Sequence, residues 1–421
     1  MTRRRLLRNG TLAAAAIAGI PVAGVSAVEF GPRAGVAIAA SPPPTPAPQQ
    51  RLWASRARAT YDALQRHFYA GDGTGLYHET FPPLPPPAYS YLWPFSRVLA
   101  GTMALAGIPS DLGGDRRYEA AVGDRLAALA HYRDVVTHPP GYDSGVLPPA
   151  GTGGDKYYDD AAWIGLALAQ HHRMTGAATS LHAARRVLQF VYPGGWEKNR
   201  RTPHPGGIFW VQQGIGLGRT NHDRTATSNA PNAELAFHLA QLYPRHRAAY
   251  ERAGTRIHTW VTRTLYDVDG SGLVYDHVRG DGAIDPTLYT YNQGVLVAAD
   301  VMRYRLTGNP VWLAQAQSLA SAALARFSPT YYVEHSAAFN AIYFRGLLQL
   351  HAVSPGAPLQ AAIETAIQTY ADAVWRRHRS PEGLYRFADS PANSYSLLDQ
   401  GAVLQLFATL AWNAADYPKL A

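Results

Sequence analysis

The sequence contains no cysteine, very little lysine and few charged residues for its length. None of its 421 residues is cysteine, which excludes disulfide bonds, thiolate nucleophiles and cysteine-ligated metals. Charged residues make up only 16% of the chain and hydrophobic residues 47%, so it can bury one large core or two smaller ones. Lysine occurs only at Lys156, Lys198 and Lys419, and arginine therefore carries nearly all of the positive charge.

The net charge is modest once the start of the chain is set aside. The whole sequence carries +8, but five arginines and one glutamate lie in the first forty residues. Removing them lowers the net charge to +4, which is too little and too scattered to indicate nucleic-acid binding. Aromatic residues reach 11%, with 25 Tyr and 9 Trp. This is compatible with stacking on sugar rings, although aromatic side chains are also common in protein cores.

The N-terminus has the pattern of a targeting segment. Residues 3–8 carry a twin arginine, and residues 12–28 form an apolar stretch with a proline, which makes a poor membrane span. We expect export through a twin-arginine signal to an extracellular or cell-envelope location; an uncleaved N-terminal anchor is the alternative. The expected organisation is a signal peptide at 1–39, a Pro-rich linker at 40–50 and one folded domain at 51–421.

Helical periodicity dominates the folded part, where alternating β-branched runs are few. Twelve helical segments are predicted: Leu52–Ala70, Tyr89–Ala106, Asp115–Tyr132, Tyr158–Thr175, Ala177–Phe190, Thr225–Leu242, Arg245–Leu265, Thr287–Thr307, Pro310–Phe327, Ala337–His351, Ala357–Arg376 and Ser394–Ala414.

These segments alternate between two kinds of helix. The odd-numbered ones are amphipathic and charged, and the even-numbered ones are nearly free of charge inside. A helix that is apolar on all sides is buried on all sides. Six buried helices alternating with six polar-faced ones predict an all-α fold, an (α/α)6 barrel or toroid in a single domain. An all-α solenoid is the competing architecture, but the sequence has no strict repeat that favours it.

Several even-numbered segments begin with polar and aromatic residues together. In a toroid the inner helices all start at the same end, so these residues converge on one funnel, the usual form of a ligand site. Helix capping by Ser, Asn and Asp is the alternative, and it accounts for about one residue at each start. The starts are at Tyr91–Arg97, Tyr157–Trp163, Ser228–Glu234, Tyr289–Gly294 and Asn393–Tyr395.

Two adjacent aspartates, Asp159 and Asp160, lie at the start of one apolar segment, between a pair of tyrosines and Trp163. Adjacent carboxylates repel each other and lose hydration in a cleft, which favours a functional interpretation. The alternative is a helix start, because Asp is a good N-cap and suits the macrodipole in the first turn. Asp155 and Glu234 are the reserve carboxylates if the pair is not the catalytic one.

The chain resembles glycoside hydrolase family 76, the endo-α-1,6-mannanases and their relatives, which have an (α/α)6 fold. The resemblance runs from about Leu52 to Ala414. The motifs that carry it occur in the expected order and read YLWPFSR, YYDDAAW, GGIFWVQ, TSNAPNAELAFHLA, LYTYNQGVLVAA and FNAIYFRGLLQL. It implies a retaining hydrolase of mannan-type polysaccharide in which Asp159 is the nucleophile and Asp160 the acid/base, with no cofactor or metal. Many members have Asn directly after the pair, where this chain has Ala161, and this puts fine substrate preference in doubt.

The chemistry of retention fits an adjacent pair. A retaining enzyme needs carboxyl groups about 5–5.5 Å apart, and consecutive Cα atoms are about 3.8 Å apart. The ~6.5–9.5 Å separation of an inverting pair would be hard to reach. A helix N-terminus favours the anionic nucleophile, and repulsion from it raises the pKa of its partner, which can then act as the acid.

Further residues of the helix starts, and Trp210 in the long Tyr192–Arg224 loop, are candidates for substrate contact or for support behind it. Aromatic rings suit sugar faces, and side-chain amides suit vicinal hydroxyls; for Trp163, core packing is the main alternative. The predicted substrate-binding residues are Trp93, Tyr158, Trp163, Trp210, Asn229, Tyr291, Asn292 and Gln293.

Two other functions remain open from the sequence. One is a toroid enzyme with another sugar chemistry, although an epimerase would be expected to place histidines in the funnel. The other is a glycan-binding or transglycosylating cell-wall protein on the same fold, which would not need both aspartates if it only bound glycan. We expect a polysaccharide partner, a monomer and no stable membrane span. The Asp267–Gly272 segment is similar to the start of a calcium loop, but position twelve, Val278, is no ligand, so a tight turn is expected.

Overall fold

A computed structural model describes residues 48–84, 88–138, 140–354 and 358–421. The predicted signal peptide and most of the predicted linker lie outside the described residues. The first helix begins at Pro48, within the stretch that the sequence assigned to the end of the linker.

Thirteen α-helices and seven two-residue strands are present among the described residues. The helices are α1 (Pro48–Phe68), α2 (Leu92–Ala106), α3 (Arg116–Ala128), α4 (Tyr158–Thr175), α5 (Ala178–Val191), α6 (Ala226–Leu242), α7 (Arg247–Thr264), α8 (Thr290–Thr307), α9 (Pro310–Arg326), α10 (Pro329–Glu334), α11 (Ala337–His351), α12 (Pro358–Arg377) and α13 (Leu397–Leu410). The strands are β1 (Thr80–Phe81), β2 (Arg133–Asp134), β3 (Gly141–Tyr142), β4 (Arg224–Thr225), β5 (His277–Val278), β6 (Ile284–Asp285) and β7 (Tyr395–Ser396).

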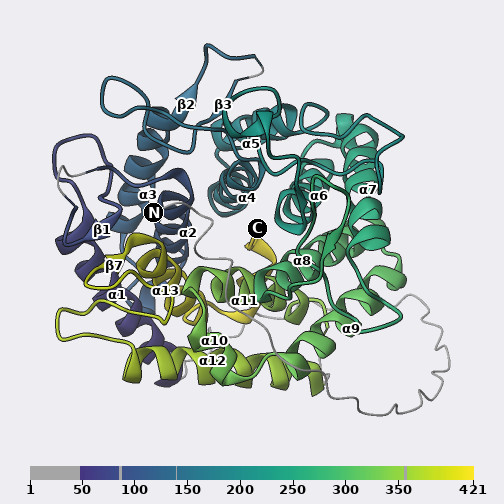
Figure 1. Cartoon of the computed structure of the whole chain (residues 1–421). Coiled ribbons are helices and arrows are strands. Elements are labelled where there is room, and N and C mark those ends of the chain that lie inside the picture. The colour runs from purple at the N-terminus through teal and green to yellow at the C-terminus, as the bar shows by residue number, and fades with distance from the viewer. Residues whose placement is uncertain (1–47, 85–87, 139, 355–357) are drawn as a thin grey trace. The chain divides into compact units, whose positions relative to one another are not determined.

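Six helices form a closed inner ring. Helices α2, α4, α6, α8, α11 and α13 each contact the next, and α13 returns to contact α2. Helices α3, α5, α7, α9 and α12 lie outside, each against the inner helix that precedes it in the chain, and α1 covers α13 (Figure 1). The closed ring confirms the predicted (α/α)6 toroid over an open solenoid.

The two rings bury their surfaces differently, as the sequence pattern predicts. All fifteen residues of α11 and all fourteen of α13 are buried. The outer helix α12 buries only five of its twenty residues, spaced along one stripe. A helix that is buried all round needs no polar face, whereas an outer helix keeps one toward water.

Glycines allow neighbouring inner helices to approach closely. A Cβ added to Gly294 of α8 would lie 2.4 Å from the Cα of Tyr343 on α11. On the other side of the same contact, a Cβ on Gly346 would lie 2.2 Å from the carbonyl oxygen of Gly294. Backbone meets backbone at this point, and no side chain fits between the helices.

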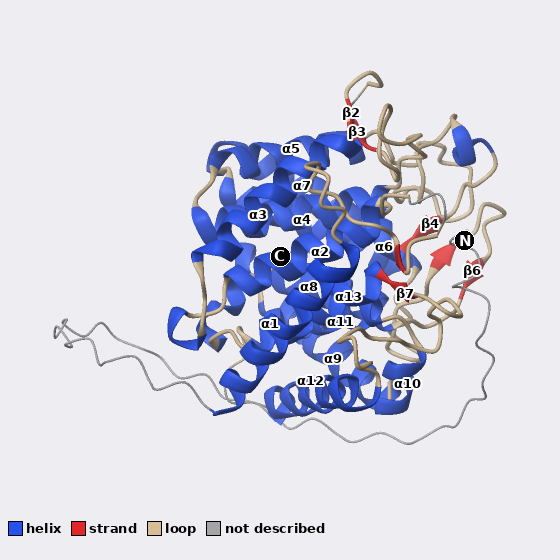
Figure 2. Ribbon diagram, turned by 90° about the vertical axis from the view of Figure 1, so that its left-hand side faces the viewer, coloured by secondary structure: helices blue, strands red, loops and turns tan. Residues whose placement is uncertain are grey.

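The connections that lead into the inner helices gather at one end of the ring. Figure 2 shows the strands and long loops on one side of the helices, which is the side that faces the viewer in Figure 1. The strands form short antiparallel sheets, β1 with β7, β2 with β3, and β4 with β5 and β6. They stiffen the loop-bearing end, where the inner helices begin.

The twelve predicted segments are all helical, and their ends differ from the prediction by four residues at most. The short α10 was not predicted. It has only six residues and is too short to show a period; it is capped by the preceding Ser328, whose hydroxyl accepts the N–H of Tyr331 at 3.2 Å. No helix in the described ranges is both long and apolar enough to span a bilayer.

Candidate active site

The adjacent aspartates are the second and third residues of α4. The N-cap position belongs to Tyr157, which has an extended backbone and no side-chain capping bond. The interpretation of Asp159 or Asp160 as the N-cap is therefore wrong, although both lie in the first turn. Their carboxylates are close to the positive end of the helix dipole, which favours the anionic form.

Asp159 is held by two donors of different origin. Its Oδ1 accepts the backbone N–H of Asp160 at 2.9 Å, and its Oδ2 accepts the indole N–H of Trp210 at 3.2 Å. Asp159 is 8% exposed and Asp160 only 1%. Hydrogen bonds to a carboxylate favour its charged form and fix its orientation. Asp159 is thus arranged as an oriented anion at the edge of the buried interior.

The loop that carries Trp210 is hydrogen-bonded to the start of α4. The N–H of Tyr158 donates to the carbonyl oxygen of Trp210 at 2.9 Å, and Trp210 in turn donates its N–H to the carbonyl oxygen of Asp223 at 2.7 Å. The ring of Tyr157 packs on Trp210 with centroids 4.9 Å apart. Tyr157 and Trp210 are both partly exposed. They present two aromatic rings beside Asp159, and Tyr157 was not among the predicted contacts.

Tyr291 approaches the pair from α8. Burial raises the pKa of its hydroxyl well above the ordinary value, and the negative charges of Asp276 and Asp159 add to the effect. The hydroxyl donates to Oδ1 of Asp276 at 3.3 Å, and the amide of Asn292 donates to the same oxygen at 2.9 Å. Tyr291 therefore stays protonated within electrostatic reach of Asp159, and Asn292 acts through Asp276.

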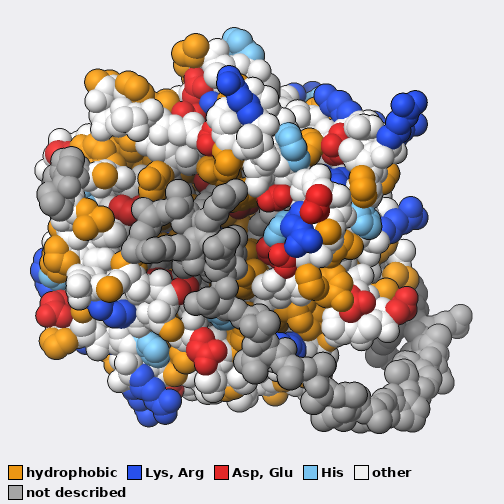
Figure 3. All heavy atoms as spheres, in the orientation of Figure 1, with side chains coloured by type: hydrophobic (Ala, Val, Ile, Leu, Met, Phe, Trp, Pro, Cys, Tyr) orange, Lys and Arg blue, Asp and Glu red, His pale blue; other side chains and the backbone are white. Residues whose placement is uncertain are grey.

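Asp276 and His277 are functional candidates that the sequence did not reveal. Nδ1 of His277 lies 2.9 Å from Oδ2 of Asp276. Burial acts to lower the pKa of His277, but the bond and charge of Asp276, with Asp223 and Asp285 nearby, raise it overall. The two residues lie in a loop with no periodicity, so only the fold brings them next to Tyr291. Figure 3 shows further acidic side chains near the centre of this face, while most Lys and Arg side chains lie toward its rim.

Trp93 belongs to an aromatic wall shared by three inner helices. Its ring stacks on Phe339 of α11, with centroids 6.2 Å apart and planes at 23°. Phe339 in turn contacts Tyr291 at 4.3 Å and Tyr289 at 5.5 Å. Trp93 is partly exposed, whereas Phe339 and Tyr289 are buried. Phe339 and Tyr289 therefore support the wall, and Trp93 offers its accessible surface.

Asn229 and Gln293 hold loops rather than facing outward. Oδ1 of Asn229 accepts the N–H of Ile208 at 2.7 Å, and its amide donates to the carbonyls of Ile208 and Thr225 at 2.9 and 2.8 Å. Gln293 binds both backbone groups of Val274 in the same way. Both side chains have an exposed fraction of 0%. The structure thus gives these two amides a structural role and corrects their prediction as sugar ligands.

The same clamp recurs at the start of the last inner helix. Gln400 accepts the N–H of Tyr385 at 2.8 Å and donates to the carbonyls of Tyr385 and Ser396 at 2.9 and 3.1 Å. At the starts of α6, α8 and α13, the side-chain amide of Asn229, Gln293 or Gln400 bonds the preceding loop to the inner helix. This explains why Asn and Gln recur at these starts, since a buried loop backbone needs partners for its N–H and C=O groups.

Tyr158 and Trp163 pack inside the protein. The ring of Tyr158 lies against Phe190 of α5, 5.2 Å between centroids, and burial raises its pKa to about 12. Trp163 is 4% exposed, and the guanidinium of Arg97 lies 5.2 Å from its ring centroid. Tyr158 thus faces the outer ring and Trp163 the interior, one turn below the aspartates. The structure corrects Tyr158 as a surface contact and supports the packing alternative for Trp163.

The reserve carboxylates are engaged elsewhere. Asp155 accepts the N–H of Leu217 at 3.2 Å and so holds a loop. Glu234 is fully buried and forms a two-pronged ion pair with Arg345 at 3.0 and 2.8 Å. Burial alone would raise the pKa of Glu234, but Arg345 and His238 outweigh it and lower the pKa to about 2. Both carboxylates are thus engaged in structural contacts, and Asp159 and Asp160 remain the candidate catalytic pair.

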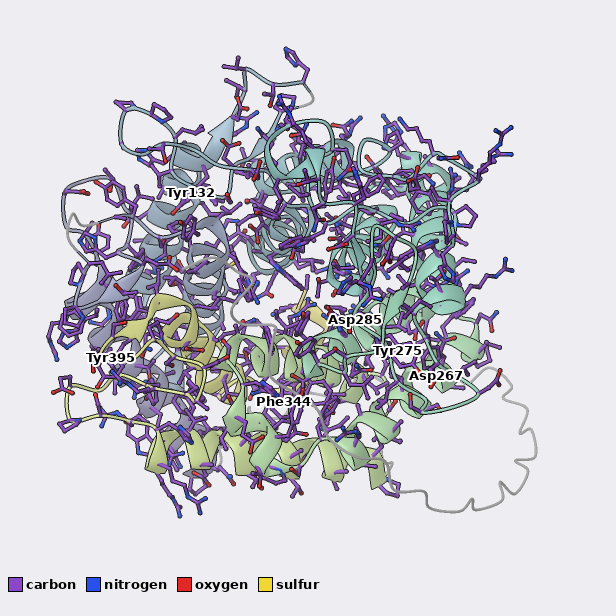
Figure 4. All side chains as sticks on the ribbon, in the orientation of Figure 1. Tyr132, Asp267, Tyr275, Asp285, Phe344 and Tyr395 are labelled. Atoms are coloured by element: carbon purple, nitrogen blue, oxygen red, sulfur yellow. The ribbon has the colours of Figure 1, made fainter. Side chains whose placement is uncertain are left out.

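The rejected calcium loop is a turn in the structure. Asp267 and Tyr275, labelled in Figure 4, are joined by a hydrogen bond of 2.9 Å from the tyrosine hydroxyl. Asp267 also accepts the N–H of Ser271 at 2.8 Å. Within the described residues, no group of three or more His, Asp or Glu side chains is placed to hold a metal ion.

The architecture agrees with comparisons to known proteins. The model of glycosyl hydrolase family 76 matches residues 52–419, while no curated protein gives a match. Among solved structures, the chain is similar to the family 76 mannosidase Bt3792 from Bacteroides thetaiotaomicron, with a TM-score of 0.74 and 18% identity over 86% of this chain and 98% of that chain.

Two further structures have the same fold. One is an inactive variant of the α-1,6-mannanase GH76A of Salegentibacter sp. HEL1_6, in which two consecutive aspartates are replaced by asparagine, in complex with α-1,6-mannotriose. Its TM-score is 0.66, with 19% identity over 85% of this chain and 99% of that chain. The other is Dfg5 from Chaetomium thermophilum in complex with glucosamine, with a TM-score of 0.65 and 16% identity over 87% and 90%. At these identities the likeness shows the fold, and the family match covers most of the sequence. The chain therefore belongs to glycosyl hydrolase family 76.

Proposed function

We propose that this protein is a retaining glycoside hydrolase that cleaves α-1,6-mannosidic linkages in a mannan-type polysaccharide. The observation that carries the proposal is the adjacent pair Asp159 and Asp160 in the first turn of α4, with Asp159 bonded to the indole of Trp210. The Salegentibacter mannanase, inactive when two consecutive aspartates are replaced, supports this reading of the pair.

Asp159 takes the role of nucleophile. Its two bonded oxygens and its place at a helix N-terminus keep it anionic and oriented. Its carboxylate attacks the anomeric carbon, the glycosidic C–O bond breaks, and a glycosyl-enzyme ester forms. Tyr291 is protonated and within reach of the Asp159 charge, and its hydroxyl donates to the nucleophile or the sugar only by leaving Asp276, its acceptor in this structure.

Asp160 takes the role of acid and then of base. It is nearly fully buried beside an anionic neighbour, and both conditions favour a protonated carboxyl group. It gives its proton to the departing glycosidic oxygen in the first step. In the second step it takes a proton from the water that attacks the ester, which restores both side chains and releases a sugar of unchanged anomeric configuration.

The partly exposed aromatic side chains offer the sugar contacts. Trp210 and Tyr157 lie on one side of the nucleophile, and Trp93 belongs to the wall that leads to Tyr291. Such rings suit the apolar faces of sugars. Since Asn229 and Gln293 are used on the backbone, polar recognition falls to groups such as Asp276 and His277.

The decisive experiment combines single replacements with product analysis. Asp159→Asn and Asp160→Asn are assayed with α-1,6-mannan beside wild type, and Asp155→Asn serves as a matched control, because Asp155 holds a loop. We expect both active-site variants to lose oligosaccharide release and the control to keep it. Proton NMR of the first product formed by wild type should show the α anomer. A β product, or full activity in either active-site variant, would refute the mechanism.

A transglycosylase is the second candidate, favoured by the similarity in fold to the glucosamine complex of Dfg5. The same glycosyl-enzyme would then be attacked by a sugar hydroxyl instead of water. Adding excess α-1,6-mannotriose to the reaction separates the two. Products longer than the donor would dominate for a transglycosylase, whereas a hydrolase gives mainly shorter sugars.

We also propose export by the twin-arginine route, on the basis of the N-terminal sequence. Residues 1–50 are fused to a reporter that needs folding before export, and Arg4 and Arg5 are replaced together by lysine. Export of the wild-type fusion and its loss in the double variant are expected. Equal export of both fusions would contradict the proposal.

A further inference from the structure

A small cavity lies inside the inner ring, below the catalytic pair. Side chains of α2, α4, α11 and α13 line it together with Ala421, and it has room for only one small group. Figure 1 shows the C-terminal end near the centre of the ring. The lining residues are Arg97, Ala100, Met103, Trp163, Leu166, Ala167, Gln170, Arg345, Gln405 and Ala421.

Two arginines line this cavity, and only one has a carboxylate partner. Arg345 binds Glu234 with both terminal nitrogens. Arg97 is 4% exposed, and its one hydrogen bond within the described residues is a long one, 3.4 Å, from Nε to the hydroxyl of Ser96. No ion pair within 4.0 Å joins Arg97 to any described carboxylate. Its guanidinium lies over Trp163, which supplies a cation–π contact but no counter-charge.

Arg97 nevertheless remains charged at neutral pH. Burial lowers its pKa, and repulsion from Arg345 adds to this, while attraction to Asp160 opposes them; the result is about 9. A buried charge without a partner costs several kcal/mol. Arg97 faces the cavity, and Arg345 adds a second positive charge there. Burial of these two charges is therefore favourable only with a negative charge close by.

The cavity also contains polar side chains with unused hydrogen-bonding capacity. Gln405 is 5% exposed, and its Oε1 has no hydrogen-bond partner among the described residues. If the oxygen and nitrogen of this amide are exchanged, its NH₂ group takes the position of Oε1 and offers two hydrogen-bond donors there. Gln170 uses its Oε1 to accept the N–H of Ala421 at 3.2 Å. Met103, Leu166 and Ala167 complete the wall with apolar surface, which leaves no room for a large polar ligand.

We propose that this cavity is a binding site for one small monovalent anion of the halide type, held by the guanidinium of Arg97 beside Arg345 and by the amide of Gln405. The inference rests on the proposed function in one respect: Asp160, which attracts Arg97 when ionised, is protonated in that mechanism and then leaves Arg97 without a charged partner.

The direct test is crystallographic. Crystals of the full chain are soaked in sodium bromide, and the anomalous signal of bromine is mapped. A peak in contact with the guanidinium of Arg97 is expected. Bromide found only at the protein surface overturns the proposal. So does bromide in the cavity at crystal concentration only, with no halide effect in solution.

The solution test is thermal unfolding at constant ionic strength, with sodium gluconate replaced stepwise by sodium chloride or bromide. Binding to the folded state alone raises Tm in a saturable way. A Tm that does not respond to halide overturns the proposal.

Two variants and a control make the assignment specific. Arg97→Gln should lose both the bromide peak and the halide response. Gln405→Glu supplies a fixed carboxylate, so it should keep or raise Tm in gluconate and lose the halide response; it remains informative if Arg97→Gln does not fold. Arg303→Gln is the matched control, because Arg303 also stacks on a tryptophan, Trp312, but away from the cavity, and should respond like wild type. A halide response that survives Gln405→Glu, or that Arg303→Gln abolishes, contradicts the site.

Discussion

The inner and outer rings of this toroid differ in where they place charged residues. Outer helices keep charged residues on the face toward water, as in the exposed i, i+4 pair of Arg247 and Glu251 on α7. Inner helices have no such face, and every charged residue of α6, α11 and α13 is buried. A buried charge must be paired or perform a function. Each buried charged residue of the inner ring therefore needs a structural or a functional explanation.

The charges of the inner ring fall into distinct kinds. Glu234 and Arg345 are paired deep in the ring, with Gln349 donating to Glu234 at 2.9 Å. Asp159 and Asp160 lie at the loop-bearing end, where the inner helices begin. We propose that the first kind stabilises the fold and that the second performs chemistry. This division can be tested by matched changes in the two rings.

The largest contrast is expected for activity. Replacing Asp159 or Asp160 by Asn should lower kcat by about 10³-fold or more, because an amide neither attacks the anomeric carbon nor transfers the proton. Glu119→Gln on the outer helix α3, at an exposed position, should leave kcat unchanged. Initial rates on α-1,6-mannan measure both. Comparable losses for Glu119→Gln and for the pair would break the distinction between the rings.

The next contrast concerns stability. Glu234→Gln leaves the buried guanidinium of Arg345 without its charge partner, and breaking a buried ion pair costs about 3–5 kcal/mol. Glu251→Gln removes one half of the exposed pair on α7, which is worth about 0.5 kcal/mol or less. Urea unfolding of each variant gives both free energies. If Glu234→Gln were as mild as Glu251→Gln, the inner pair would not be a stabilising element.

Glycine to alanine should have opposite signs in the two rings. Gly294→Ala on α8 brings a Cβ to 2.4 Å from the Cα of Tyr343, so the helices must separate, at a cost of about 1–3 kcal/mol. Gly123→Ala on α3 meets nothing within 4 Å and should stabilise by about 0.5–1 kcal/mol through helix propensity. Thermal unfolding measures both, and two changes of the same sign would contradict the close inner contact.

The sequence predicts the rings better than it predicts the site. Runs such as residues 337–351 are apolar all round, and burial on every side follows from that pattern alone. Asp159 and Asp160 could be singled out because adjacent acidic residues are unusual at the start of an apolar helix, and Trp210 because it lies in the loop motif GGIFWVQ. Asn229 could not be assigned correctly, because an amide binds a backbone or a sugar hydroxyl equally well. Asn229 binds backbone because the fold brings the loop around Ile208 against the helix.

Asp276 and His277 show a second limit. Asp276 binds Tyr291 and Asn292, and its neighbour His277 belongs to β5. The position of this segment is set by the pairing of β5 with β4 and β6. Nothing local in the sequence marks that pairing, since the strands have two residues each. Sequence patterns thus identify helices and the residues that begin them, while contacts supplied by the loops require the structure.

The smallest expected effect is a pH dependence that arises from an inner-ring carboxyl. Asp399 of α13 accepts hydrogen bonds from the hydroxyl of Ser336 at 2.7 Å and the N–H of Ala337 at 2.9 Å, and so joins α13 to the start of α11. Burial raises its pKa to about 7, and the negative charge of Asp389 contributes. Burial likewise raises the pKa of Asp389 to about 6.

A carboxyl whose pKa is higher in the folded state holds its proton there at pH values where the unfolded chain has lost it. The folded state then binds more protons than the unfolded state between about pH 4 and 7, and stability falls as the pH rises through this window. Asp399→Asn can keep both accepted bonds but cannot ionise, so its Tm should fall less than that of wild type between pH 5 and 8. Asp281→Asn, at an exposed position, should follow wild type. Parallel pH curves for wild type and Asp399→Asn would mean that this inner carboxyl is already ionised in the folded protein at pH 5, and that the bonds from α11, not burial, decide its charge.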